Sequence, residues 1–449
     1  MSSLASEKLA VQFLVITSLA LILGCQKRSD LGTNTAKQGS ATANTLSSLN
    51  GTITGASMAP MLMGEHHASE CSECGFEMRF EIMKSDSKFI CSNCGAENRL
   101  ANREVKTLLG DQRLFETCPS NRAIQHWEVV AFKSTTGNES DHKVKRIVGL
   151  PGETIELQAG DLYVNGERIV KPENVFEKMR ILVHDSNSAP KSNPRWMRNQ
   201  QQAHFPVKLS SDNTSLRYQH IGCYRKRDQR REELIKDYYG FNQTLSRSLN
   251  TVSDFGVAIT LTDPAGLQIE LEMRSQKYGR VQFDFEQNTD QSALDRYSIW
   301  QRLNEEGKKK GFAGSLSNLP GSCVLQFWLL DGVARLIVDG TVCGEHQLDE
   351  NRPVPPRPLT KTQVKDARFE VITPSNQIVL SKLTAKNGEI RRIRIFRDLY
   401  YYDRQPGRKH ALGEDEYFVL GDNVPVSNDS RHFGGIKRDS VIALLQNKK

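Results

Sequence analysis

Residues 144–153 read VKRIVGLPGE, an apolar run with two cations near its start and a Gly-Leu-Pro-Gly turn at its end. A second apolar run, Val129 to Lys133, precedes it, and a third, Leu162 to Val164, is followed by Asn165-Gly166. Short apolar runs between glycine and proline turns are typical of strands, and Asn-Gly is a preferred two-residue hairpin turn. We therefore predict a β core in which Lys145 stands at the start of a strand.

The composition of the chain limits its class. The 449 residues are 38% hydrophobic and 25% charged, which fits several folded domains and excludes both a fully disordered chain and a polytopic membrane protein. The net charge of +7 is spread along the chain instead of forming one basic patch, so no nucleic-acid partner is indicated. Nine cysteines are too few for a disulfide-dense scaffold of this length.

A serine and a lysine are candidates for paired chemistry. Ser57 lies in GTITGASMAPML, residues 51–62, between a glycine that permits close backbone approach and a proline that fixes a turn. Lys145 adjoins residues that a strand would bury, and burial favours the neutral amine, which is the form that acts as a base. The ordinary alternatives are a surface serine that caps a turn and a lysine with its amine in water.

A third polar segment follows an apolar run near the C-terminus. Residues 416–435 read EYFVLGDNVPVSNDSRHFGG, in which Ser427, Asp429 and Arg431 alternate with a period of two and so could share one face of an extended segment. Asp429 and Arg431 could form an ion pair, and Ser427 could hydrogen-bond the lysine amine. The alternative is an ordinary solvated loop.

In content and in order, these three segments resemble the type I signal peptidases. The resemblance rests on Ser-Met-x-Pro, on Lys-Arg followed by Val-Gly-Leu-Pro-Gly, and on Gly-Asp-Asn followed by Ser-x-Asp-Ser-Arg. It implies that Ser57 is the nucleophile and Lys145 its general base, that the backbone N–H of Ser57 meets the oxyanion, and that Ser427 orients the lysine amine with support from Asp429 and Arg431.

The sequence departs from the pattern of that family at three places. Gly55 stands where some members carry a second hydroxyl donor to the oxyanion, Trp127-Glu128 replaces a Gly-Asp pair, and Val424-Pro425 replaces a polar pair. None of them removes a member of the implied Ser-Lys pair.

The resemblance also implies an activity and a location. It implies a membrane-bound serine endopeptidase that removes N-terminal signal peptides with small residues at positions −1 and −3 from exported preproteins, without a cofactor for catalysis. The expected location is the inner cell membrane, with the catalytic domain on the extracytoplasmic side. Two alternatives remain: an envelope lipoprotein or binding module on an inactive peptidase scaffold, and a self-cleaving Ser-Lys regulator of related fold, which the membrane segment disfavours.

An apolar segment near the N-terminus, Leu9 to Leu23, is short for a membrane span and has the length of a secretory h-region. We favour an uncleaved anchor over 1–24, followed by a linker over 25–50. A cleaved signal peptide and a lipoprotein signal with Cys25 as the modified residue are alternatives, and a buried core helix is a fourth.

Four cysteines form two knuckles of the Cys-x-x-Cys-Gly type, at Cys71 and Cys74 and again at Cys91 and Cys94. This spacing predicts a zinc-ribbon-like insert over 65–105 with a structural zinc, because four thiolates leave no open position for catalysis. The competing interpretation is two disulfides in an oxidising compartment.

Most of the remaining sequence is a predicted insert over 171–413. Runs that alternate with a period of two predict strands and a β-sandwich-like domain, at residues 257–261, 267–271, 281–285, 324–330 and 334–338. The predicted fold is therefore mainly β. A signal-peptidase-type core, made of 51–64, 106–170 and 414–449, carries both inserts and an N-terminal membrane segment.

Overall fold

The structure is a computed structural model. All described residues belong to one compact unit, Leu46–Lys449. The helices among them are short, α1 (Glu173–Met179) and α3 (Ser430–Phe433), and strands dominate, so the predicted mainly-β class is confirmed. The residues that the structure describes are 48–134, 142–188, 195–199, 201–222, 231–288, 290, 293–302, 310–350 and 377–446.

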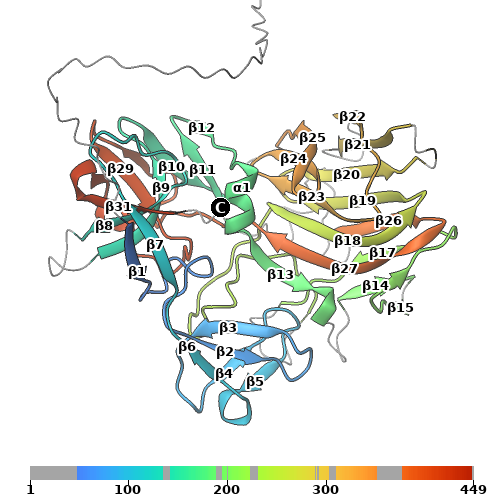
Figure 1. The fold of residues 1–449 in the computed structure, drawn as a ribbon, viewed down its shortest axis with the longest axis horizontal. Coiled ribbons are helices and arrows are strands. Elements are labelled where there is room, and N and C mark those ends of the chain that lie inside the picture. The colour runs from blue at the N-terminus through green and yellow to red at the C-terminus, as the bar shows by residue number, and fades with distance from the viewer. Residues whose placement is uncertain are drawn as a thin grey trace, which may run out of the picture. The chain divides into compact units, whose positions relative to one another are not determined.

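One seven-stranded sheet, the core sheet, combines strands from both ends of the chain (Figure 1). Its antiparallel partners β9 and β29 bring Phe418 opposite Gly149, so the segment after β29 lies beside the strand that carries Lys145. In sheet order the strands are β1 (Ser48–Thr52), β7 (Gln112–Thr117), β31 (Val441–Leu445), β8 (Val129–Lys133), β9 (His142–Gly149), β29 (Glu416–Leu420) and β30 (Ile436–Lys437).

A four-stranded sheet follows the core sheet in the chain. Its turn at Asn165-Gly166 has backbone φ angles of 52° and 87°, the left-handed conformation that a two-residue hairpin of this kind requires, so the predicted hairpin is confirmed. β28, which falls within the predicted insert of 171–413, pairs with β10. In sheet order the strands are β12 (Glu167–Arg168), β11 (Asp161–Val164), β10 (Thr154–Gln158) and β28 (Lys409–Ala411).

The cysteine module, residues 65–108, lies between β1 and β7 in the chain. Its small core contains the cysteines and a stacked pair, Phe80 and Phe89, whose ring centroids are 4.6 Å apart. The module contains a three-stranded sheet, β3 (Glu77–Glu81), β2 (His66–Glu70) and β6 (Lys106–Leu108), the pair β4 (Lys88–Ile90) and β5 (Glu97–Arg99), and the 3-10 turn η1 (Leu100–Asn102).

Two larger sheets lie face to face (Figure 1). One apolar cluster joins them, in which Phe283 of one sheet contacts Phe327 of the other with ring centroids 5.4 Å apart. The five strands predicted from the sequence all belong to these sheets. One sheet contains β13 (Ile181–Asp185), β16 (Val207–Lys208), β18 (Phe255–Ala265), β23 (Ser322–Leu330), β24 (Val333–Val338), β25 (Thr341–Gln347) and β27 (Asn387–Arg397). The other contains β14 (Trp196–Arg198), β15 (Gln201–Gln202), β17 (Leu216–Tyr218), β19 (Gln268–Ser275), β20 (Gly279–Glu286), β21 (Asp295–Arg302), β22 (Lys310–Leu316) and β26 (Ile378–Thr384).

The predicted membrane segment, Leu9 to Leu23, and Cys25 lie outside the described residues. Among the residues that are described, no helix has the length and apolar character needed to cross a membrane.

Candidate active site

Ser57 and Lys145 meet although 88 residues separate them in the sequence. The amine of Lys145, on β9, donates a hydrogen bond of 2.6 Å to Ser57 Oγ and one of 3.1 Å to the Val144 carbonyl. Lys145 is 4% exposed, whereas Ser57 is only half-buried in the loop after β1. A buried amine therefore contacts the hydroxyl of a half-buried serine.

Burial lowers the pKa of Lys145 from 10.5 to about 8, opposed by the nearby carboxylates of Asp429 and Asp422 and aided by the charge of Lys143. At pH 7 a pKa near 8 leaves about a tenth of the amine neutral, against about one part in three thousand at the ordinary value. The environment of β9 thus supplies a substantial population of the form that can accept a proton.

The Gly421-Asp422-Asn423 turn, which follows β29, holds the loop of Ser57. The Asn423 backbone N–H donates to the Ser57 carbonyl at 3.0 Å, and its side-chain Nδ2 donates to the Ala56 carbonyl at 3.0 Å. A Cβ on Gly421 would lie 2.4 Å from the Ser57 carbonyl oxygen and 2.2 Å from Ser427 Oγ. Only glycine permits this approach of the turn to the Ser57 loop.

A buried ion pair fixes the same turn to β9. Arg146 donates from Nε to Asp422 Oδ1 at 2.8 Å and from Nη2 to Oδ2 at 2.6 Å, and both side chains are buried. Its Nη1 also donates to the Trp127 carbonyl at 2.9 Å. Trp127 has a φ of 73°, a left-handed conformation that favours glycine, which gives a physical reason for the glycine that the family pattern places there.

Asp429 and Arg431 form the predicted ion pair, but not on one face of an extended segment, because Arg431 lies in α3 and Asp429 is the N-cap of that helix. Arg431 donates to both carboxylate oxygens of Asp429, at 2.8 and 2.9 Å, and to the Val424 carbonyl at 2.7 Å. Asp429 also accepts from the Gly421 backbone N–H at 3.1 Å and caps α3 at its N-terminus. The Asp429–Arg431 pair therefore connects the Gly421-Asp422-Asn423 turn to the start of α3.

Ser427 is 3% exposed, and within the described part of the chain its hydroxyl has no hydrogen-bond partner. Its backbone N–H donates to the Asn423 carbonyl at 3.0 Å. No hydrogen bond joins Ser427 Oγ to the Lys145 amine in the described residues, so the orienting role of Ser427 stays a prediction. The free hydroxyl is nevertheless close to the Ser57 loop, as the contacts of Gly421 show.

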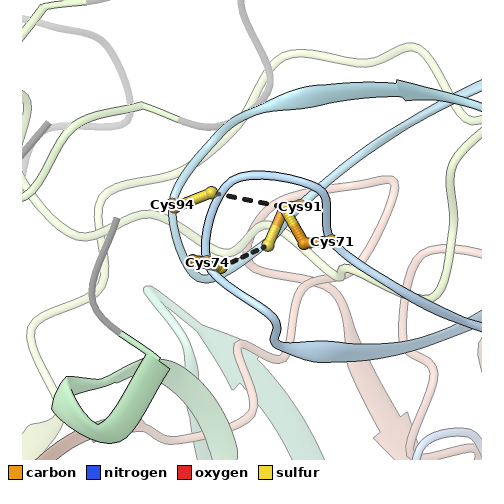
Figure 2. Close-up of side chains that lie close together, drawn as sticks. All are labelled: Cys71, Cys74, Cys91 and Cys94. Atoms are coloured by element: carbon orange, nitrogen blue, oxygen red, sulfur yellow. Dashed lines mark hydrogen bonds between the residues drawn. The ribbon is translucent and has the colours of Figure 1, made fainter. Parts of the chain in front are cut away.

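The four knuckle cysteines converge from two loops of the cysteine module (Figure 2). The Sγ atoms of Cys71 and Cys94 are 3.6 Å apart, those of Cys74 and Cys91 are 3.7 Å apart, and all four lie within 4.8 Å of one another. All four are free thiols. These separations are too long for disulfides and match the edges of a tetrahedron of sulfurs around a zinc ion with Zn–S bonds of about 2.3 Å.

The surroundings of the sulfurs also suit a metal. The Asn98 amide donates to Cys71 Sγ at 3.6 Å, and the Ala96 backbone N–H donates to Cys94 Sγ at 3.4 Å, contacts that stabilise thiolate charge. Hydrogen bonds from the other three cysteines hold the pKa of Cys71 below the ordinary value and raise that of Cys91. The cluster could therefore bind a structural metal, which would let all four sulfurs ionise.

A sequence model of the family described as "Signal peptidase, peptidase S26" matches residues 96–213 and 333–447, which together are more than half of the chain. The chain belongs to this family. Lys145 and the polar group at 427–431 lie within the matched ranges, whereas Ser57 lies outside them.

Individual members of the family match shorter stretches. The chain is 43% identical to "Signal peptidase I V" of Bacillus subtilis (strain 168) over 53 residues, which are 11% of this chain and 29% of that protein. It is 37% identical to a "Signal peptidase I" of Bacillus amyloliquefaciens over 68 residues, 15% of this chain and 34% of that protein. The chain thus matches about a third or less of the length of these relatives.

The solved structures that the chain is similar to include the exoplasmic/lumenal domain of VIP36. That match has a TM-score of 0.24 and 11% sequence identity, and covers 47% of this chain and 86% of that domain.

Sequence reasoning identified the three polar segments but missed two contributors to the geometry. The motif pointed to Gly-Asp-Asn, but nothing in the sequence indicated that Asn423 bonds the Ser57 loop. Asn242, which bonds Asn423, lies in a loop of the predicted insert without a recognisable motif. Because the two asparagines are 181 residues apart, only the three-dimensional structure reveals the pair.

Proposed function

We propose that this chain is a membrane-bound serine endopeptidase that removes signal peptides from exported preproteins, with Ser57 as nucleophile and Lys145 as general base. The observation that carries the proposal is the 2.6 Å hydrogen bond between a buried lysine amine of lowered pKa and the hydroxyl of a half-buried serine. Membership in the signal peptidase family adds the reaction class.

The proposed chemistry needs one proton acceptor at two steps. The neutral Lys145 amine takes the proton of Ser57 Oγ as that oxygen attacks the scissile carbonyl, and the resulting oxyanion accepts a hydrogen bond from the Ser57 backbone N–H. The C–N bond then breaks, Lys145 gives its proton to the leaving amine, and an acyl ester remains on Ser57. Lys145 next takes a proton from water as the water oxygen attacks the ester. The bond between Ser57 Oγ and the acyl carbon then breaks, Lys145 returns the proton to Ser57 Oγ, and the signal peptide leaves with a new terminal carboxyl group.

The proposed substrates and location are supported by membership in the family. The proposed substrates have small residues at positions −1 and −3, and the proposed location is the inner membrane with the catalytic residues on the extracytoplasmic side. Met58, beside the nucleophile, is buried in an apolar cluster with Ile53 and Leu62, so it serves core packing. Met61 is only partly buried and is available for an apolar rim.

We propose a structural zinc ion held by Cys71, Cys74, Cys91 and Cys94. With four thiolate ligands the ion has no open position for substrate or water, so it would stabilise the cysteine module. In the proposed chemistry no cofactor takes part in catalysis.

The test is cleavage of a model preprotein by membranes that contain the wild type, Ser57→Ala or Lys145→Ala. Two residues away from the site supply matched controls: Ser440→Ala changes a serine that is half-buried like Ser57, and Lys133→Ala changes an exposed lysine. We expect wild type and controls to cut after the small-residue site, mapped by mass spectrometry, and each site variant to lose about 10⁴-fold or more in rate.

Absence of cleavage by the wild-type chain would also be informative. A wild-type chain with its native circular dichroism spectrum that cuts none of a panel of preproteins would contradict the proposal. It would favour an envelope lipoprotein or binding module on an inactive peptidase scaffold.

A further inference from the structure

A short segment of the predicted insert, Tyr239–Thr244, contacts the proposed active site. It lies outside the ranges 96–213 and 333–447 that match the family. The Tyr239 hydroxyl donates a hydrogen bond of 3.0 Å to the carbonyl of Asp422, within the turn that holds Ser57. A part of the chain outside the matched ranges therefore contacts the turn that holds the loop of Ser57.

Asn242 and Asn423 form a reciprocal amide pair. Asn242 Nδ2 donates to Asn423 Oδ1 at 2.7 Å, and Asn423 Nδ2 donates back to Asn242 Oδ1 at 2.8 Å. Asn242 is 5% exposed and Asn423 is fully buried. The pair fixes the plane of the Asn423 amide and directs its second N–H to the Ala56 carbonyl, 3.0 Å away. Without Asn242, the Asn423 amide could rotate and lose this bond.

The same segment packs against the Ser57 loop. Phe241 is buried in a small cluster with Ala59 and Met63, against which Ala56 also packs. Ala56 precedes Ser57 in the sequence, and Ala59 and Met63 follow it, so the Phe241 ring supports the Ser57 loop on both sides. Asn423 at the same time bonds the Ala56 and Ser57 carbonyls.

The other end of the segment is anchored on the cysteine module. The Gln243 side chain accepts a hydrogen bond from the Ile90 backbone N–H at 2.8 Å through Oε1 and donates one to the Ile90 carbonyl at 3.2 Å from Nε2. Ile90 directly precedes Cys91 in the sequence. Thr244 donates to Glu81 Oε1 from its backbone N–H at 2.6 Å and from its hydroxyl at 2.9 Å. The segment is thus bonded to both the cysteine module and the proposed active site.

We propose that Tyr239–Thr244 is a positioning segment for the Ser57–Lys145 pair, with Asn242 acting through Asn423. The inference rests on the proposed function. Lys145 is fixed within the core sheet, whereas Ser57 lies in a loop, so the distance between Oγ and Nζ depends on what holds the loop. A displacement of about 1 Å in a reacting group can lower a rate about 10²-fold.

The experiment compares kcat and KM for preprotein cleavage by wild type, Asn242→Ala, Asn423→Ala and the double variant. We expect Asn242→Ala to lower kcat about 10- to 100-fold with KM changed less than about threefold. Because Asn242 acts through Asn423, the double variant should equal Asn423→Ala alone. Asn213→Ala, which alters an exposed asparagine bonded to the Ser381 carbonyl, is the matched control and should equal wild type.

A second readout does not depend on activity. Amide hydrogen exchange of residues 55–63 should be faster in Asn242→Ala than in wild type and unchanged in Asn213→Ala. Tyr239→Phe, which removes only the hydroxyl bonded to Asp422, should produce a smaller change in the same direction and provides a test if Asn242→Ala does not fold.

These readouts separate failure of the inference from failure of the proposed function. A wild type without Ser57-dependent cleavage would refute the function, and the exchange data would still decide whether the segment holds the loop. Unchanged kcat and unchanged exchange in both Asn242→Ala and Tyr239→Phe would overturn the inference. A higher KM with unchanged kcat would also overturn it, because it would assign the segment to substrate binding.

Discussion

Replacing Lys145 by methionine should abolish cleavage and at the same time stabilise the folded chain at neutral pH. Burial lowers the pKa of Lys145 from 10.5 to about 8, so keeping the amine protonated in the fold at pH 7 costs about 3 kcal/mol. Methionine has a similar length and carries no charge. The substitution removes that cost but also the hydrogen bonds to Ser57 Oγ and the Val144 carbonyl, at about 1 kcal/mol each.

The net gain expected at pH 7 is therefore about 1–2 kcal/mol. Its pH dependence follows from the two pKa values. The unfolded chain keeps the proton of Lys145 up to about pH 10.5, whereas the folded chain keeps it only up to about pH 8. The cost is fully present below pH 8 and disappears as the pH rises toward 10.5. At pH 10 the loss of the two hydrogen bonds should outweigh the remaining cost of the buried charge. Lys145→Met should therefore be less stable than wild type at pH 10, although it is more stable at pH 7.

The assay should report on the core sheet itself, because that sheet carries Lys145. The two larger sheets have an apolar cluster of their own, so a probe of the whole chain would also report on their unfolding. Cys118 is buried in the apolar cluster of that sheet, with Val130 and Ile147. Urea unfolding at pH 7 and pH 10 can be followed by the rate at which a thiol reagent labels Cys118, with mass spectrometry to identify the labelled residue. Lys133→Met, which changes an exposed lysine, is the control. If Lys145→Met is less stable than wild type at pH 7, or if the difference is the same at both pH values, the reasoning is refuted.

Three further predictions concern the turn, the oxyanion and the metal. Gly421→Ala places a Cβ 2.4 Å from the Ser57 carbonyl oxygen, so the Ser57 loop must shift, and kcat should fall about 100-fold while the circular dichroism spectrum stays unchanged. A kcat within about twofold of wild type would show that the turn does not approach the Ser57 loop so closely. A Cβ at Gly55 would meet no other atom within 4 Å, so a serine should fit there. Gly55→Ser should raise kcat up to about 10-fold, because its hydroxyl adds a hydrogen-bond donor to the oxyanion. A lower kcat would argue against an oxyanion site beside residue 55. Metal analysis of the purified chain should find one zinc per chain, lost in Cys71→Ser and kept in Cys118→Ser, whereas disulfides found by mass spectrometry would refute the metal site.

Local sequence patterns predicted those features that depend on neighbouring residues. Alternation with a period of two is set by the geometry of a strand, so the runs at 257–261 and 281–285 could be assigned without knowing their partners. The Asn165-Gly166 turn is equally local, because both residues tolerate the left-handed conformation that it requires. The two knuckles define their own loops, and Gly75 and Gly95 adopt positive φ angles there.

Features that depend on packing could not be predicted in the same way. The sequence showed that burial would favour a neutral Lys145, but how far the amine is buried depends on strands from both ends of the chain. The expected bond from Ser427 to Lys145 is not present in the described residues. The Asn242–Asn423 pair joins loops whose sequences have no periodic pattern, so nothing local marks either residue as a partner of the other.

The pH dependence of kcat/KM for preprotein cleavage by the wild-type chain shows directly whether neutral Lys145 is the base. If neutral Lys145 is the base, kcat/KM should rise with pH through a single proton loss near pH 8 and then level off, while Ser57→Ala stays inactive throughout. A profile that is flat from pH 6 to 10, or that rises only near 10.5 as for a lysine in water, would show that a buried, neutral Lys145 does not activate Ser57.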